Sequence, residues 1–137
     1  MSTRQTRNEG ATKAGEGRYL FDLARLARIE VGKGYSPAEG PVVEGERMQV
    51  GLITIRRGEA SQPHSHPNEQ WTYVLKGRAR VKVGDQPETL ASPGTLIYSP
   101  ANVVHSVEVL PDEDFVFFTV KDLSHGIVGT PARGAPK

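Results

Sequence analysis

The sequence predicts an all-β fold, either a sandwich or a barrel of short strands, from two observations. Glycine and proline are frequent, at 15 and 10 of the 137 residues, and they separate short apolar runs. These turn signals recur about every 8 to 12 residues, which is typical of a β-sandwich or barrel. Strand and helix patterns do not alternate, so a parallel nucleotide-binding sheet is disfavoured.

The strands are expected between residues 47 and 120. Apolar residues alternate at 48, 50 and 52 and then change phase near Gly51, which indicates a bulge or a strand buried on both faces. Further β-rich runs follow at 71–75, 79–83, 95–98, 103–109 and 115–120. The region 19–31 fits neither period and is interpreted as a short strand or a single helical turn, and 32–45 as a loop.

The length fits one domain, with a looser segment at each end. Residues 1–17 are polar and glycine-rich and are expected to be flexible. Residues 18–125 are expected to form the folded part, and 126–137, with glycine or proline at five positions, a loose tail. His125 stands at this last boundary and is expected at the surface, unless the tail folds over the barrel mouth.

Composition excludes several classes of function. The 17 basic and 16 acidic residues leave a net charge of +1, too small to attract nucleic acid or an anionic membrane. No run approaches the ~20 apolar residues that span a bilayer, and the N-terminus lacks the apolar core of a secretory signal. The absence of cysteine excludes disulfides, thiolate metal sites and thiol nucleophiles. We therefore expect a cytoplasmic protein that acts on a small molecule, with no nucleic-acid or membrane partner.

Histidines carry the candidate chemistry. His64 and His66 are two residues apart, so on a strand both imidazoles face the same way and can hold one cation. His105 arrives from a later strand, after Pro100. Three histidines and one oxygen donor would leave one or two coordination positions open for substrate. A lone pair of histidines at this spacing also occurs by chance on polar strand faces.

Two motifs around these histidines resemble those of the cupin family. The first cupin motif is a glycine, five residues, H-x-H, three or four residues, a glutamate, six residues and a glycine. This chain has Gly58, His64, His66, Gln70 and Gly77 at that spacing. The second cupin motif is G-x5-P-x-G-x2-H-x3-N, and here its positions are occupied by Gly94, Pro100, Asn102, His105 and Val109.

The resemblance implies a double-stranded β-helix, also called a jelly-roll barrel, and a homodimer. It also implies one divalent transition-metal ion bound by His64, His66, Gln70 and His105. The sequence does not choose between manganese, iron, nickel, zinc and cobalt. Glu69 is the competing fourth ligand, although strand parity places it opposite His66. Asn102, at a family glycine, tolerates the left-handed backbone better than most residues.

Glutamine in place of the family's glutamate affects the expected chemistry. A neutral amide oxygen leaves the metal its full charge, which favours Lewis-acid catalysis. The resemblance to cupins implies an enzyme of the isomerase, cyclase or lyase type that acts on a small oxygenated substrate. Glu69, Tyr98 or a water would then move the proton. The alternatives are a metal-dependent dioxygenase, which the missing glutamate weakens, a non-enzymatic binding or sensor protein, and a purely structural metal.

Overall fold

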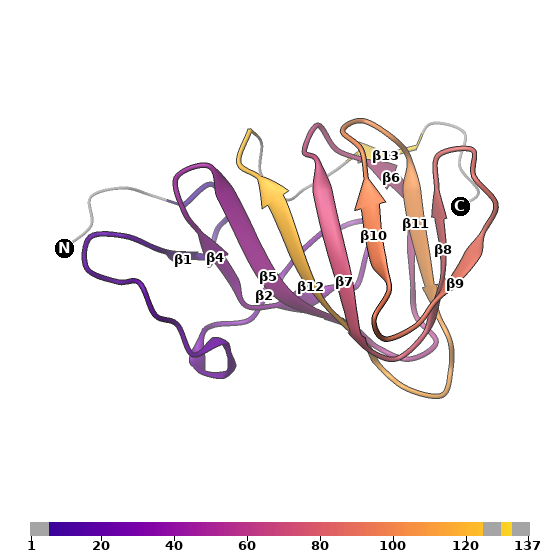
Figure 1. Cartoon of the computed structure of the whole chain (residues 1–137), viewed down its shortest axis with the longest axis horizontal. Coiled ribbons are helices and arrows are strands. Elements are labelled where there is room, and N and C mark those ends of the chain that lie inside the picture. The colour runs from indigo at the N-terminus through magenta and orange to yellow at the C-terminus, as the bar shows by residue number, and fades with distance from the viewer. Residues whose placement is uncertain (1–5, 125–129, 133–137) are drawn as a thin grey trace.

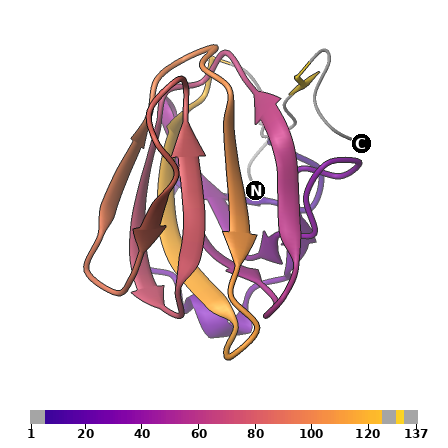
Figure 2. The same ribbon diagram turned by 90° about the vertical axis from the view of Figure 1, so that its right-hand side faces the viewer.

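The computed structural model describes residues 6–124 and 130–132, which form two facing β-sheets (Figures 1 and 2). The strand order of the larger sheet is β1-β4-β5-β12-β7-β10, with β3 on β5 and β2 on β3. The smaller sheet runs β13-β6-β11-β8-β9. All strand pairs are antiparallel except β1 with β4. The prediction of an all-β, jelly-roll double-stranded β-helix is confirmed.

The strands of the larger sheet are β1 (Thr12–Lys13), β2 (Ile29–Glu30), β3 (Glu39–Gly40), β4 (Val42–Glu44), β5 (Met48–Ile55), β7 (Gln70–Lys76), β10 (Leu96–Ser99) and β12 (Phe115–Asp122). Those of the smaller sheet are β6 (Ala60–Ser65), β8 (Ala79–Val83), β9 (Thr89–Ala91), β11 (His105–Val109) and β13 (Thr130–Pro131). The described residues include one 3₁₀ turn, η1 (Leu23–Arg25), and contain no helix long and apolar enough to cross a membrane.

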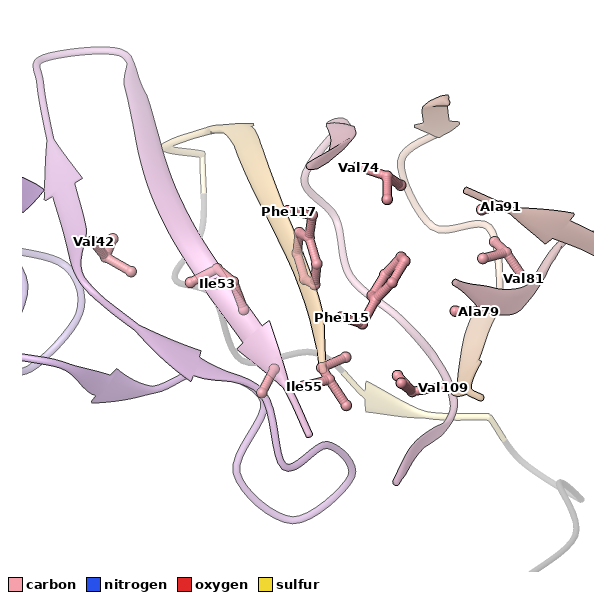
Figure 3. Packing of buried hydrophobic residues seen from close by; sticks show 11 residues of the cluster. Val42, Ile53, Ile55, Val74, Ala79, Val81, Ala91, Val109, Phe115 and Phe117 are labelled. Carbon is pink, nitrogen blue, oxygen red and sulfur yellow. The ribbon is translucent and has the colours of Figure 1, made fainter. Parts of the chain in front are cut away.

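The core fills the space between the two sheets. Alternate residues of facing strands point inward because side chains alternate along a strand. The buried cluster in Figure 3 comprises Val42, Ile53, Ile55, Val74, Ala79, Val81, Ala91, Val109, Phe115 and Phe117. Burying each of the larger side chains stabilises the fold by about 1.5–3 kcal/mol, and this packing fixes the positions of the strands that carry the polar site.

The change near Gly51 in the alternation of apolar residues does not come from a β-bulge. Strand β5 pairs with β12 in one continuous register from Met48 to Ile55. The buried positions of β5 are Gln49, Gly51, Ile53 and Ile55, so at one end of the strand the inward places are polar or small. Val50 and Leu52 lie half-buried on the outer face, so the strand has apolar residues on both faces.

Part of the segment expected to be flexible is attached to the larger sheet. Thr12–Lys13 pair with β4, and Asn8 is buried. The buried carboxylate of Glu44 accepts hydrogen bonds from the backbone amides of Arg7 and Asn8 and from Asn8 Nδ2. The described part of residues 1–17 therefore differs from the expectation, because a carboxylate in β4 holds it.

The ambiguous region 19–31 contains both of the predicted structures. Leu23–Arg25 form the 3₁₀ turn, which begins where the Asp22 carboxylate accepts from the backbone amide of Ala24 at 3.1 Å. Ile29–Glu30 form a strand that pairs with β3. At the other end of the chain, Thr130 and Pro131 pair with Ser65 and His64 of β6. His125 lies outside the described residues.

Two motif residues occupy turns that side chains rarely tolerate. Gly77 has φ +79°, and a Cβ there would lie 2.2 Å from the carbonyl oxygen of Asp114, so only glycine fits. Asn102, at the family's glycine position, has φ +64°, as its tolerance of left-handed backbone predicts. Its backbone amide donates to the carbonyl of His66 at 2.8 Å, which ties this turn to the histidine pair.

Candidate metal centre

Strand pairing brings three imidazoles together. His64 on β6 is the cross-strand partner of His105, the first residue of β11, and His66 follows the end of β6. The ring centroids of His105 lie 4.4 Å from His64 and 4.8 Å from His66. One ligand nitrogen of each ring lies within 4.8 Å of the others, and all three residues are buried. The predicted convergence of two sequence-distant stretches on one possible metal site is confirmed.

The backbone fixes which nitrogen of each ring is available. Each Nδ1 lies within hydrogen-bonding distance of a carbonyl oxygen two residues away in the chain. The carbonyls belong to Gln62 at 2.7 Å, Asn68 at 3.0 Å and Val103 at 3.0 Å. A carbonyl only accepts, so we assign the proton to Nδ1 in each ring, and this leaves the Nε2 lone pairs unprotonated. Such outer hydrogen bonds are what orients histidine ligands in metal sites.

Burial keeps these imidazoles neutral. Desolvation, with the nearby His105 adding to it, lowers the pKa of His64 to about 3. Desolvation and the positive charge of Lys121 lower the pKa of His66 to about 4, and burial also lowers the pKa of His105. At neutral pH a metal ion therefore meets three unprotonated nitrogens and displaces no proton from them.

Gln70, the first residue of β7, turns its amide oxygen toward the same place. The Thr119 hydroxyl donates its one proton to the carbonyl of Trp71 at 3.1 Å, so it accepts from Gln70 Nε2 at 2.6 Å. Gln70 Oε1 consequently faces His66 Nε2 at 3.1 Å. With the proton on Nδ1, two lone pairs face each other there, an arrangement that a shared cation stabilises. Three neutral imidazoles beside an amide oxygen form a donor set that suits a divalent transition-metal ion.

Glu69 and Tyr98 lie on the outer face of the larger sheet. The Tyr98 hydroxyl donates to the Glu69 carboxylate at 2.6 Å, and the Tyr98 ring packs against Trp71 with centroids 4.5 Å apart. Neither residue lines the interior cavity, whereas Ile97 and Ser99, on either side of Tyr98, do. Strand alternation therefore turns both predicted proton-transfer groups away from the imidazoles, and these positions do not favour the catalytic role expected for them.

A cavity of about 100 Å³ inside the barrel adjoins the imidazoles. Its walls are mostly apolar, and His64, Gln70 and His105 contribute to them. The ring of Tyr35 also lines it and lies 4.1 Å from that of His64.

The polar residues that line this cavity and that the sequence analysis did not select include Gln49 on β5 and Lys121 on β12. Burial lowers the pKa of Lys121 to about 8, so most molecules carry the ammonium at pH 7. The period of two from Phe115 and Phe117 to residue 121 was a signal that would have placed this lysine inside.

A double-stranded β-helix with three histidines that could hold a metal ion is the class of protein that these features define. Residues 51–121 match the family profile of the cupin domain, which covers more than half of the chain. The chain belongs to the cupin family.

Similar proteins include both uncharacterised proteins and enzymes. An uncharacterised protein of Streptomyces coelicolor is 29% identical over 66 residues, which cover 48% of this chain and 62% of that protein. The polyketide cyclase RemF from Streptomyces resistomycificus superposes with a TM-score of 0.71 at 18% identity, covering 82% of this chain and 84% of that one. The DMSP lyase DddQ from Ruegeria pomeroyi gives 0.61 at 17% identity, covering 72% and 49%. At these identities the two structures show the common fold.

Titration of the imidazoles tests the proposed environment. In the metal-free folded protein, His64 and His66 should titrate near pH 3 and pH 4, followed through their ring C–H signals by NMR. In urea the same residues should titrate near the ordinary value of about 6.5. The unfolded chain then binds more protons than the folded chain below pH 6.5, so the free energy of unfolding should fall as the pH decreases through this window. A folded-state titration near 6.5 for either ring would contradict the burial described here.

Proposed function

We propose that this cupin is a metal-dependent enzyme that acts on a small oxygenated substrate by Lewis-acid catalysis of the isomerase, cyclase or lyase type. One divalent transition-metal ion would be held by His64, His66, His105 and Gln70. The observation that carries the proposal is the convergence of three unprotonated Nε2 atoms, each ring being held through Nδ1 by a backbone carbonyl. The cyclase and the lyase among the similar structures are consistent with it.

Gln70 is favoured over Glu69 as the fourth ligand by the direction of its side chain. Its amide oxygen faces His66 Nε2, and Thr119 keeps the amide from flipping. The Glu69 carboxylate is exposed and bonded to the Tyr98 hydroxyl on the other face. A neutral ligand oxygen also suits Lewis-acid chemistry, because it does not reduce the charge of the ion.

These positions indicate what each part of the site would contribute to the reaction. A bound divalent ion would polarise a substrate oxygen. The apolar walls exclude water and strengthen every electrostatic contact inside the cavity. Lys121 and Tyr35 both line the cavity and would place polar side chains next to a substrate bound there.

Substitution of the fourth ligand tests the metal site. Gln70→Ala removes one of four ligands and should weaken zinc binding about 10- to 100-fold, as loss of an interaction at the metal typically does. Glu69→Ala is the matched control, because it removes the neighbouring oxygen donor and should leave the affinity unchanged. Calorimetric titration of the metal-free proteins with Zn²⁺ measures both, and elemental analysis gives the stoichiometry. Normal binding by Gln70→Ala, or a loss confined to Glu69→Ala, would reverse the assignment.

Deuterium exchange tests the reaction class. The zinc-loaded protein in D₂O, given a panel of small hydroxyketones, hydroxyaldehydes and keto acids, should exchange a C–H next to the carbonyl for C–D, seen as loss of a ¹H NMR signal. The proton leaves the carbon to a base and a solvent deuteron replaces it, so no oxidant is consumed. His105→Ala should abolish the exchange. Saturable binding without exchange would instead indicate a binding or sensor protein, and oxygen uptake by the iron-loaded form alone would indicate a dioxygenase.

We also propose that the protein is a homodimer that pairs through the outer face of β7 and β10. Trp71, Tyr73, Leu75 and Leu96 there are 44%, 46%, 47% and 57% exposed. They are contiguous, since Leu96 is the cross-strand partner of Tyr73 and Tyr98 that of Trp71. Soluble monomers rarely leave so many large apolar side chains together in water. A second copy would cover them with the same face, as in a two-fold symmetric dimer.

Sedimentation tests this pairing. The wild-type protein should sediment as a dimer, and Tyr73→Lys should sediment as a monomer because it places a charge in the centre of the face. Thr89→Lys adds the same charge at an exposed position on the smaller sheet and should remain dimeric. A monomeric wild-type protein, or a dimer that tolerates Tyr73→Lys, would refute this interface.

A further inference from the structure

Three inward residues form a row beside the candidate metal centre. Lys121 on β12 is the cross-strand partner of Gln49 on β5 and of Gln70 on β7. All three side chains line the interior cavity. An ammonium group and an amide that is no part of the proposed ligand set therefore stand next to the residue proposed to complete the metal site.

The amide of Gln49 is oriented by two buried residues, Asn8 and Glu44, the second of which is its cross-strand partner on β4. Glu44 carries a buried carboxylate, which can only accept, so the Asn8 amide nitrogen must face it; that nitrogen donates to Glu44 Oε2 at 2.6 Å. The second hydrogen of the same nitrogen goes to Gln49 Oε1 at 2.7 Å. Oε1 of Gln49 therefore already accepts a hydrogen bond from Asn8, and Nε2 is the other polar atom of this amide.

Gln49 Nε2 has no hydrogen-bond partner among the described residues, although Gln49 is only 2% exposed. A buried N–H without a partner is costly, and native proteins usually satisfy such groups. Gln49 lines the cavity, and its cross-strand partner on β12 is Lys121. An acceptor that enters the cavity would complete the hydrogen bonding of Gln49.

The charge of the cavity indicates the kind of acceptor. Its lining, within the described residues, includes no aspartate or glutamate, while Lys121 contributes an ammonium. A divalent ion on the three histidines would add more positive charge. The rest of the wall is largely apolar, so this positive charge is only weakly screened by water. A small organic anion matches both the positive charge of the cavity and the donor Gln49 Nε2.

We propose that Lys121 and Gln49 form a carboxylate-binding subsite inside the barrel, which selects small organic acids as substrates. Lys121 supplies the charge and Gln49 Nε2 a directed hydrogen bond, while Asn8 and Glu44 are positioning residues that hold the Gln49 amide. The inference rests on the proposed function in one respect, namely that the other end of the substrate binds the metal ion. The subsite itself consists of residues of this chain and can be tested without turnover.

Glycolate and its amide, glycolamide, are a matched pair of probes that differ in the carboxylate charge. Calorimetric or NMR titration into the zinc-loaded wild-type protein should give tighter binding of glycolate. Lys121→Met keeps the length of the side chain and removes its charge; it should weaken glycolate binding about tenfold or more and glycolamide binding less than twofold. Gln49→Met should weaken glycolate binding severalfold by removal of one donor. Lys82→Met, on the exposed face of β8, is the control and should change neither affinity.

Elemental analysis and thermal melting of each variant separate the possible failures. Glycolate binding unchanged in folded, zinc-replete Lys121→Met would overturn the subsite, and so would equal losses for the two probes. If Lys121→Met does not fold, the comparison of glycolate with glycolamide binding is made with Gln49→Met instead. A wild-type protein that binds no zinc yet still prefers glycolate, with the preference lost in Lys121→Met, would defeat the proposed metal chemistry and leave the subsite standing. Absence of any preference in the wild-type protein, with or without zinc, would overturn the subsite.

Discussion

The structure depends on the antiparallel pairing of β6 with β11, which places His105 opposite His64. Without a shared cation, three buried imidazoles in van der Waals reach of one another gain little, because each loses hydration at Nε2 when it leaves water. The fold compensates at Nδ1, where each ring has a backbone carbonyl. What remains is a set of inward lone pairs whose only strong partner is a positive ion. The rest of the barrel holds this strand pairing in register. The phenylalanines of β12 pack between the two sheets. The tight turns at Gly77 and Asn102 set where the neighbouring strands begin.

Because side chains alternate along a strand, β7 and β10 place different residues on the inner and the outer surface of the barrel. Gln70 and Thr72 face the cavity, while Trp71 and Tyr73 face outward; on β10, Ser99 faces in and Tyr98 faces out. One pair of strands can thus serve both a metal site and an apolar contact surface. The same division moves the Glu69–Tyr98 pair to the outside.

The sequence predicted the parts of the site that depend on short-range rules. The two-residue spacing of His64 and His66, the left-handed turn at Asn102 and the approach of His105 follow from strand periodicity and turn chemistry together with the cupin motifs. The hydrogen bonds from Asn8 to Glu44 and Gln49 could not be predicted, since they join residues 36 and 41 positions apart and no local pattern marks them. Lys121 and Tyr98 fall between these cases. Strand alternation in the sequence indicates that residue 121 faces inward with Phe115 and Phe117, whereas the chemical type of Tyr98 says nothing about the direction of its side chain.

Glutamine at position 70 and lysine at position 121 have a joint electrostatic consequence. A glutamate at 70 would offset one unit of the metal's charge and could also pair with Lys121, its cross-strand neighbour. With glutamine there, neither the ion nor the ammonium is neutralised by any carboxylate in the described cavity wall. Burying positive charge in an apolar barrel is unfavourable, and its cost falls when an opposite charge enters. The departure from the family motif and the buried lysine therefore both favour the proposed carboxylate subsite, in which the substrate would bring negative charge to a site where the described cavity wall has none.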